Sequence, residues 1–163
     1  MAGDILLTEH RSDTLRVIIN RPDKRNALSL ELLDLIGSAF AQNAADAALK
    51  CAVLTASGDR CFAAGGDLRE LEAVRSEADT LAMSRRARAA LEQIRQFPVP
   101  VIAALNGHAL GGGAELAMAC DMRIAAQSAF VATGYPKVGL SGDYGITWLL
   151  TQLVGRGRAS ELL

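Results

Sequence analysis

The chain has 163 residues, of which 50% are hydrophobic and 21% charged, and its formal net charge at pH 7 is −1. This length is enough for one domain with a sizeable core, so we expect a single domain over residues 1–163. The balanced charge gives no electrostatic case for a nucleic-acid partner or an anionic membrane. Any phosphate group must therefore be bound by a local basic patch.

The three cysteines, Cys51, Cys61 and Cys120, lie in apolar segments. Their odd number argues against a disulfide framework, and none has a His or Cys partner at metal-ligand spacing. The N-terminus carries no apolar signal core, and no apolar run reaches membrane-spanning length. We expect buried reduced thiols, no metal, no membrane and a cytoplasmic protein.

The first predicted elements are two short strands, Ile5 to Glu9 and Leu15 to Asn20, which form a hairpin. Apolar residues then recur at helical spacing over Leu30 to Ala45, and Ser29 stands at the N-cap position. The apolar face of this helix consists of Leu32, Leu33, Ile36, Phe40 and Ala44. A further strand is predicted over Cys51 to Thr55.

A glycine turn follows in the segment CFAAGGDLRE, from Cys61 to Glu70. Gly65 and Gly66 carry no side chain, so a ligand can approach the backbone there. Asp67 stands where a short helix would have its N-cap. A turn with a capping aspartate explains the same residues structurally, and the pattern does not separate the two interpretations.

The next predicted element is a long, arginine-rich helix from Glu77 to Phe97, ended by two prolines. Its expected core positions are Leu81, Leu91 and Ile94. The remaining predicted elements are strand Val101 to Leu105, helix Leu116 to Ala119, strand Met122 to Ala126 and helix Gly145 to Val154. Because strands alternate with crossover helices, the chain is predicted to be α/β with a stacked parallel sheet.

The most informative segment is NGHALGGGAE, from Asn106 to Glu115, at a predicted strand-to-helix junction. Its glycines, Gly111, Gly112 and Gly113, can aim free N–H groups at a ligand, and Glu115 beside them is a candidate proton carrier. A tight turn with a solvated carboxylate is the structural alternative. Together with the earlier glycine turn at Gly65 and Gly66, this turn suggests that each of the two gives one N–H to a single oxygen, as in an oxyanion hole. The pattern alone does not show that the turns meet in space.

Four motifs in the order found here resemble the enoyl-CoA hydratase/isomerase (crotonase) family. They are RPDKRNALS (Arg21 to Ser29), FAAGGDL (Phe62 to Leu68), NGHALGGGAELAMACD (Asn106 to Asp121) and KVGLSGDYG (Lys137 to Gly145). The resemblance implies a crotonase-like (ClpP/crotonase) spiral of β-β-α units and a homotrimer or hexamer. Family chains continue into a helical C-terminal region that helps cover the acyl pocket, so the resemblance also implies that this region is missing.

The same resemblance assigns roles in binding an acyl-CoA thioester. The N–H groups of Gly66 and Gly112 would polarise the thioester carbonyl and stabilise the enolate. Arg25 would contact a phosphate of coenzyme A, and the backbone around Ala27 would meet the adenine, although a Lys-Arg pair in a loop is usually a solvated surface. The implied binding residues are completed by Ala64, Gly66, Asp67, Leu68 and Gly112. Coenzyme A is part of the substrate, so no separate cofactor is expected.

The carboxylates bear on which reaction is catalysed. Family hydratases use two glutamates, of which the first matches Glu115 and the second falls at Tyr135 or Gly134, neither of which is a carboxylate. Asp143 falls where some relatives, including dienoyl-CoA isomerases and an aryl-CoA dehalogenase, place a catalytic aspartate. It can equally cap a helix that begins near Tyr144. If Glu115 and Asp143 face one pocket, one would remove a proton and the other return it.

The sequence thus favours an acyl-CoA lyase or isomerase that hydrates or isomerises an enoyl-CoA. The alternative is a non-catalytic acyl-CoA-binding or interaction module. A glycine-loop nucleotide-binding domain is disfavoured, because neither G-x-x-x-x-G-K-[ST] nor G-x-G-x-x-G occurs. We expect His108 to pack or to form hydrogen bonds, and Trp148 to be a core residue or a trimer contact.

Overall fold

The computed structural model describes residues 4–135, 139–142 and 144–163, and its strands form two sheets. The larger sheet contains, in spatial order, β1 (Leu6–Arg11), β2 (Thr14–Ile19), β3 (Cys51–Ala56), β5 (Val101–Leu105) and β7 (Met122–Ala125). The smaller sheet contains β4 (Cys61–Ala63), β6 (His108–Leu110) and β8 (Val131–Ala132). Only β1 and β2 pair in the antiparallel direction, as the predicted hairpin, and the other described pairs are parallel.

After the hairpin, the chain repeats one path three times. Each repeat adds a strand to the larger sheet, then a strand to the smaller sheet, and then turns into a helix. The helices that follow the three strand pairs are α2 (Leu68–Ala73) with α3 (Glu77–Arg95), α4 (Gly112–Ala119) and α5 (Ile146–Leu162). The predicted α/β fold with a spiral of β-β-α units is confirmed.

Helix α1 (Leu30–Asn43) begins as its sequence predicts. The Ser29 hydroxyl accepts a hydrogen bond from the Leu32 N–H at 3.2 Å, and the Glu70 carboxylate accepts one from the Leu30 N–H at 2.8 Å. Leu32, Leu33, Ile36 and Phe40 are fully buried against the larger sheet. Ala44, predicted to share this face, lies just past the end of the helix and is exposed.

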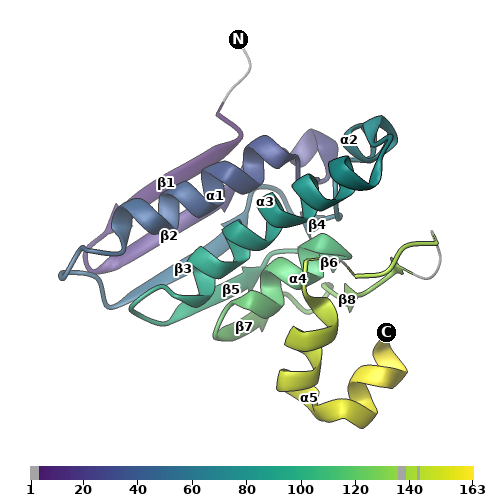
Figure 1. The fold of residues 1–163 in the computed structure, drawn as a ribbon. Helices are drawn as coiled ribbons and strands as arrows, with labels where there is room; N and C mark the ends of the chain where they lie inside the picture. The colour runs from purple at the N-terminus through teal and green to yellow at the C-terminus, as the bar shows by residue number, and fades with distance from the viewer. Residues whose placement is uncertain (1–3, 136–138, 143) are drawn as a thin grey trace.

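Helices α1 and α3 lie side by side over one face of the strands (Figure 1). The buried face of α3 includes Met83, Ala87, Leu91 and Ile94, which recur every three or four residues. Leu91 and Ile94 confirm the prediction. Leu81 does not belong to that stripe and is 47% exposed, so its assignment to the core was wrong.

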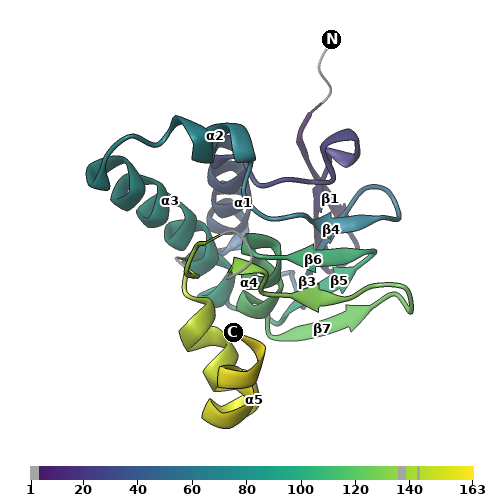
Figure 2. The same cartoon turned by 90° about the vertical axis from the view of Figure 1, so that its right-hand side faces the viewer.

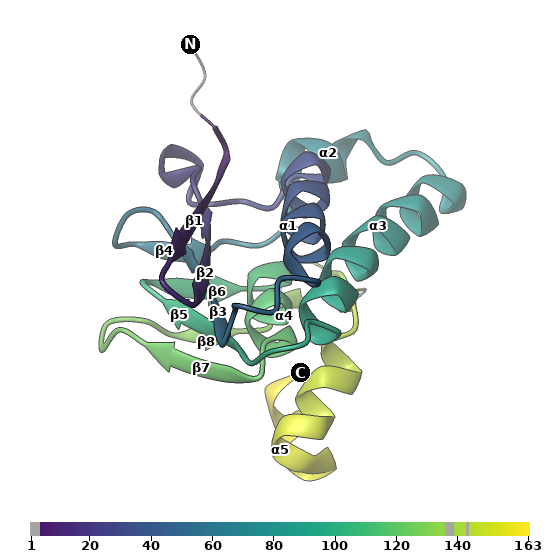
Figure 3. The same ribbon diagram turned by 90° about the vertical axis from the view of Figure 1, so that its left-hand side faces the viewer.

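Helix α5 lies at the opposite end of the molecule from α2, as Figures 2 and 3 show. A non-helical residue, Gly155 with a φ of 75°, divides α5 into two helical pieces, so the first piece ends at Val154 as predicted and a second piece runs on to Leu162. Trp148 is 51% exposed, which excludes it from the core and leaves the trimer contact as a prediction. Within the described parts of the chain, no helix combines the length and apolarity needed to cross a membrane.

The three cysteines carry free thiols. Cys61 and Cys120 are buried as predicted, whereas Cys51 is only half-buried. Burial raises the pKa of the Cys120 thiol to about 12, so this residue is protonated at neutral pH and is a poor nucleophile.

Candidate functional site

The two glycine turns meet in space. They follow β4 and β6, which are neighbouring parallel strands of the smaller sheet. A Cβ atom on Gly113 would lie 2.2 Å from the carbonyl oxygen of Ala63, and one on Gly65 would lie 3.4 Å from that of Leu110. At Gly113 only a residue without a side chain allows the backbones of the two turns to approach so closely.

Each turn reverses the chain through a glycine in the left-handed region, with φ of 104° at Gly65 and 49° at Gly111. The next residue in each turn, Gly66 or Gly112, is one of the predicted donors. Gly112 is the first residue of α4, so no carbonyl of its own helix can accept its N–H. No described residue accepts a hydrogen bond from the N–H of Gly66 or Gly112.

One aromatic side chain, that of Tyr144, lies against both predicted donors. A Cβ atom on Gly112 would lie 3.0 Å from Cε2 of Tyr144, and one on Gly66 would lie 3.7 Å from its hydroxyl oxygen. The tyrosine is only 7% exposed. Gly66 and Gly112 therefore lie against the same side chain, a proximity that the sequence pattern did not establish.

Glu115 lies in the first turn of α4 and is completely buried, which excludes the solvated carboxylate. Its Oε1 atom accepts a hydrogen bond from the N–H of Ile146, the first residue of α5, at 3.0 Å. The N-cap residue of α5 is Gly145, which has no side chain, so Glu115 caps this helix from a distance in sequence. Asp143, the predicted second acid or cap, lies outside the described residues.

The segment that contains Arg25 and Ala27 runs beside the first glycine turn. The Leu28 N–H donates to the Gly65 carbonyl at 2.8 Å, and the Asp67 N–H donates to the Leu28 carbonyl at 2.9 Å. The Ala64 N–H donates to the Arg25 carbonyl at 3.2 Å. The structure thus brings the predicted binding residues of the two segments together.

Arg25 follows the short 3-10 helix η1 (Pro22–Lys24) and has a left-handed φ of 52°. Its side chain is exposed and makes no hydrogen bond or ion pair within the part of the chain that the structure describes. Leu68 is 71% exposed at the start of α2. Both side chains are accessible to a ligand beside the first glycine turn.

Asn26 is a residue of this segment to which the sequence analysis assigned no role. It is 1% exposed, its Oδ1 atom accepts from the Arg21 N–H at 2.9 Å, and its Nδ2 atom donates to the Cys61 carbonyl at 2.7 Å and the Ser57 carbonyl at 3.0 Å. Its φ of 55° is one that asparagine adopts more readily than most residues. Asn26 therefore fastens the segment to β4.

Replacing this tether is expected to destabilise the fold. Asn26→Ala removes the acceptor of the Arg21 N–H and leaves the Cys61 carbonyl only the longer hydrogen bond from Asn106 Nδ2 at 3.4 Å, which we expect to lower the free energy of unfolding by about 3 kcal/mol. Urea unfolding measures this change. The control is Asp23→Ala, at an exposed position of the same segment, for which we expect a change within about 0.5 kcal/mol. Equal stability of the two variants would refute the tether.

Asp67 caps α2 as predicted, since its Oδ1 atom accepts from the Arg69 N–H at 3.2 Å. Its Oδ2 atom also pairs with the Arg21 guanidinium at 2.9 Å, with both side chains largely buried. Burial alone would raise the pKa of the Asp67 carboxyl. The hydrogen bonds from Arg21 and Arg69 and the charges of Arg21 and Lys24 together outweigh burial and hold that pKa below its ordinary value of 3.8.

This lowered pKa predicts a pH-dependent stability. The Asp67 contribution is fully present above the ordinary pKa of 3.8 and is lost as the pH falls through the lower pKa of the folded state. Asp67→Asn keeps an N-cap but removes the charge, so we expect it to cost about 1 kcal/mol at pH 7. The difference between wild type and variant in urea unfolding should shrink below pH 3.8. This prediction would be contradicted if the stability difference between wild type and variant stayed constant as the pH fell well below 3.8.

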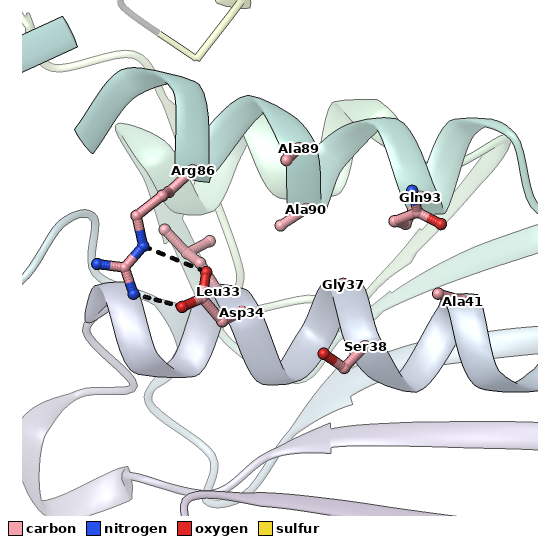
Figure 4. Close-up of a pocket in the computed structure, with 9 residues that line it drawn as sticks. All are labelled: Leu33, Asp34, Gly37, Ser38, Ala41, Arg86, Ala89, Ala90 and Gln93. Carbon is pink, nitrogen blue, oxygen red and sulfur yellow. Dashed lines mark hydrogen bonds and ion pairs between the residues drawn. The ribbon is translucent and has the colours of Figure 1, made fainter. Parts of the chain in front are cut away.

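Other features of the described residues do not add to the site. His108 packs against Phe130 with ring centroids 4.1 Å apart, which confirms its packing role. No group of three or more His, Cys, Asp or Glu side chains in the described ranges could hold a metal ion. A groove of about 340 Å³ between α1 and α3, crossed by the Asp34–Arg86 ion pair, contains none of the predicted site residues (Figure 4).

Comparison with known proteins identifies the family. The family model described as enoyl-CoA hydratase/isomerase matches residues 9–163. The chain belongs to the enoyl-CoA hydratase/isomerase family. This confirms the resemblance carried by the four motifs.

Several family members are similar over nearly the whole chain. A crotonyl-CoA hydratase of Syntrophomonas wolfei is 40% identical over 170 residues, which cover 100% of this chain and 62% of the relative. The enoyl-CoA isomerase/hydratase fer4 of Mycosarcoma maydis is 36% identical and covers 90% of this chain and 56% of the relative. The crystal structure of an enoyl-CoA hydratase from Bacillus anthracis superposes with a TM-score of 0.92 at 36% identity, covering 98% of this chain and 62% of that one. The chain therefore spans less than two thirds of the length of these relatives.

Proposed function

We propose that this chain binds an acyl-CoA thioester at the two glycine turns and hydrates or isomerises an enoyl-CoA. The observation that carries the proposal is that Gly66 and Gly112 lie against the same Tyr144 side chain, with the buried carboxylate of Glu115 in the helix that the second turn begins. The relatives support it, because they include a crotonyl-CoA hydratase and an enoyl-CoA isomerase/hydratase.

In this proposal, the N–H groups of Gly66 and Gly112 donate to the thioester oxygen. The oxygen gains negative charge when the thioester becomes an enolate, so both hydrogen bonds strengthen in the transition state. Removing one donor from such a hole typically slows a reaction by about 10²–10³-fold. Left-handed glycines directly before both donors support this role, because they orient the N–H groups before the substrate arrives.

Glu115 carries the proton to or from the carbon next to the thioester. The hydrogen bond from the Ile146 N–H fixes its orientation, which favours proton transfer along one path. A second acid is required if one group removes a proton and another returns it. Asp143 is our candidate for that group, and its role stays a prediction.

Coenzyme A would bind along the segment beside the first turn. The Arg25 guanidinium presents several donors to a phosphate, and the backbone around Ala27 and Ala64 would meet the adenine. Asp67 and Leu68 complete the binding surface. Coenzyme A enters as part of the substrate, so the proposal needs no further cofactor. Assembly into a homotrimer or hexamer and a cytoplasmic location also remain proposals.

Mass spectrometry of enoyl-CoA thioesters incubated with the protein in D₂O tests the proposal. Addition of water to a substrate would establish a hydratase. A shifted double bond, or deuterium uptake without added water, would establish an isomerase. If a folded sample leaves every thioester unchanged, the catalytic proposal is wrong, and binding of coenzyme A by that sample would support a non-catalytic module.

A further inference from the structure

We infer that Arg21 strengthens the Gly66 N–H as a donor to the thioester oxygen, because its charge polarises that N–H through two intervening peptide groups. Arg21 is thus a positioning residue, which acts on the substrate only through other groups. The inference rests on the proposed function and adds to it the source of the positive charge behind the first donor.

The chain of hydrogen bonds begins at the Arg21 guanidinium. Its Nη1 atom donates to the Ala27 carbonyl at 2.6 Å, the short distance expected when the donor is ionised. Its Nη2 atom pairs with the Asp67 carboxylate at 2.9 Å, which fixes the orientation of the planar group. The Arg21 side chain is only 10% exposed, so water and salt screen its charge weakly. The guanidinium therefore holds a fixed positive charge against one peptide carbonyl.

Two peptide groups connect this charge to Gly66. The Ala27 carbonyl shares a peptide group with the Leu28 N–H, which donates to the Gly65 carbonyl at 2.8 Å. The Gly65 carbonyl in turn shares a peptide group with the Gly66 N–H. Both peptide groups are trans, so in each the carbonyl oxygen and the N–H hydrogen point in opposite directions. The dipoles are therefore aligned from the guanidinium to the Gly66 N–H, and each bond in such a chain strengthens the next by about 10–30%.

The two predicted donors differ in what lies behind them. Gly112 is the first residue of α4, so the peptide dipoles of that helix place partial positive charge at its N–H. Gly66 precedes Asp67, the N-cap residue of α2, and so lies outside that helix. The Asp67 carboxylate beside it would oppose negative charge on a bound oxygen, and the ion pair with Arg21 offsets this effect. Arg21 thus supplies for Gly66 the positive charge that a helix supplies for Gly112.

The stretching frequency of the thioester carbonyl reports the strength of the donors without turnover. Butanoyl-CoA labelled with ¹³C at this carbonyl is bound to the protein, and infrared difference spectroscopy gives the shift of the labelled band from its position in solution. Arg21→Met removes the charge and keeps a long apolar side chain. We expect it to lose roughly a fifth to two fifths of the wild-type shift, because two hydrogen bonds are no longer strengthened. Exchange of the α-hydrogens in D₂O at saturating thioester should slow about three- to tenfold.

Two further variants separate charge from structure. Arg21→Lys keeps the positive charge beside the Ala27 carbonyl but not the planar fork, so its shift and exchange rate should lie nearer to those of the wild type than to those of Arg21→Met. Arg16→Met is the matched control, because Arg16 also pairs with a carboxylate, that of Glu9 at 2.7 Å, but lies in the hairpin and outside the proposed site. We expect it to keep the wild-type shift and an exchange rate within about twofold. Circular dichroism first establishes that each variant is folded, and Arg21→Gln replaces Arg21→Met if the latter is not.

The outcomes separate this inference from the proposed function. A reduced carbonyl shift in Arg21→Met, with most of the shift kept in Arg21→Lys, supports the inference. A folded Arg21→Met with the wild-type shift and exchange rate overturns it. Equal losses in Arg21→Met and Arg21→Lys, or in Arg21→Met and Arg16→Met, also overturn it, because the charge at this position would not be the cause. If the wild type binds no thioester, or binds it without a carbonyl shift, the proposed function fails and the inference fails with it.

Discussion

Glu115→Gln is expected to lower kcat/KM for enoyl-CoA by about 10²–10⁴-fold while leaving the affinity for the thioester nearly unchanged, because a glutamine cannot carry the proton. The substitution separates the two roles of this residue. A glutamine side-chain oxygen can still accept the hydrogen bond that Glu115 Oε1 receives from the Ile146 N–H, so the start of α5 is preserved. Steady-state kinetics and thermal unfolding measure the two effects independently.

Glu70→Gln is the matched control for this variant. Glu70 also accepts a hydrogen bond from the first N–H of a helix, that of Leu30 at 2.8 Å, but it lies outside the proposed catalytic group. We expect it to keep activity within about threefold of the wild type, because only the capping interaction is altered. Full activity in Glu115→Gln, or an equal loss in both variants, would contradict the role of Glu115 as proton carrier.

Gly113→Ala should destabilise the fold by about 3 kcal/mol or more, because its methyl group has no space. The new Cβ atom would lie 2.2 Å from the Ala63 carbonyl oxygen and 2.7 Å from the Ala63 Cβ. The Ala63 oxygen belongs to the backbone, so it cannot move aside as the end of a flexible side chain would. The two glycine turns must separate, and we expect activity to be lost together with stability. Urea unfolding gives the change in stability.

Gly157→Ala serves as the comparison for a glycine without a packing role. It lies in α5, and a Cβ atom there would meet nothing within 4 Å. Alanine is a better helix former than glycine, so we expect this variant to be unchanged or up to about 1 kcal/mol more stable. If Gly113→Ala were as stable as Gly157→Ala, the close contact between the turns would be wrong.

Much of the fold could be predicted from local patterns. The hairpin and the buried face of α1 follow from alternation and helical spacing, which depend on residues near one another in the chain. The division of strands between two sheets could not be predicted, because short apolar strands of both sheets look alike in sequence. Leu81 shows the same limit. Its apolar side chain is exposed, because it lies on a different face of α3 from the one that packs against α1, and the sequence does not reveal which face packs.

The glycine turns and Glu115 could be predicted because their residue types are unusual at strand-to-helix junctions. The contacts that hold the site together could not, because they join distant parts of the chain. Asn26 reaches Cys61 across 35 positions, and Glu115 caps α5 across 31. A local pattern contains no signal for such partners, although the burial of a lone asparagine becomes informative once the fold is known.

The most direct test of the central claim is hydrogen exchange at the carbon next to the thioester. Butanoyl-CoA is incubated in D₂O with the wild type and with Glu115→Gln, and NMR follows the loss of its α-hydrogens. The central claim is that Gly66 and Gly112 stabilise an enolate and that Glu115 carries the proton. It predicts that the wild type exchanges the α-hydrogens and that the exchange rate in Glu115→Gln is at least about 100-fold lower. A wild type that binds butanoyl-CoA without exchange, or a variant that exchanges equally fast, would contradict it.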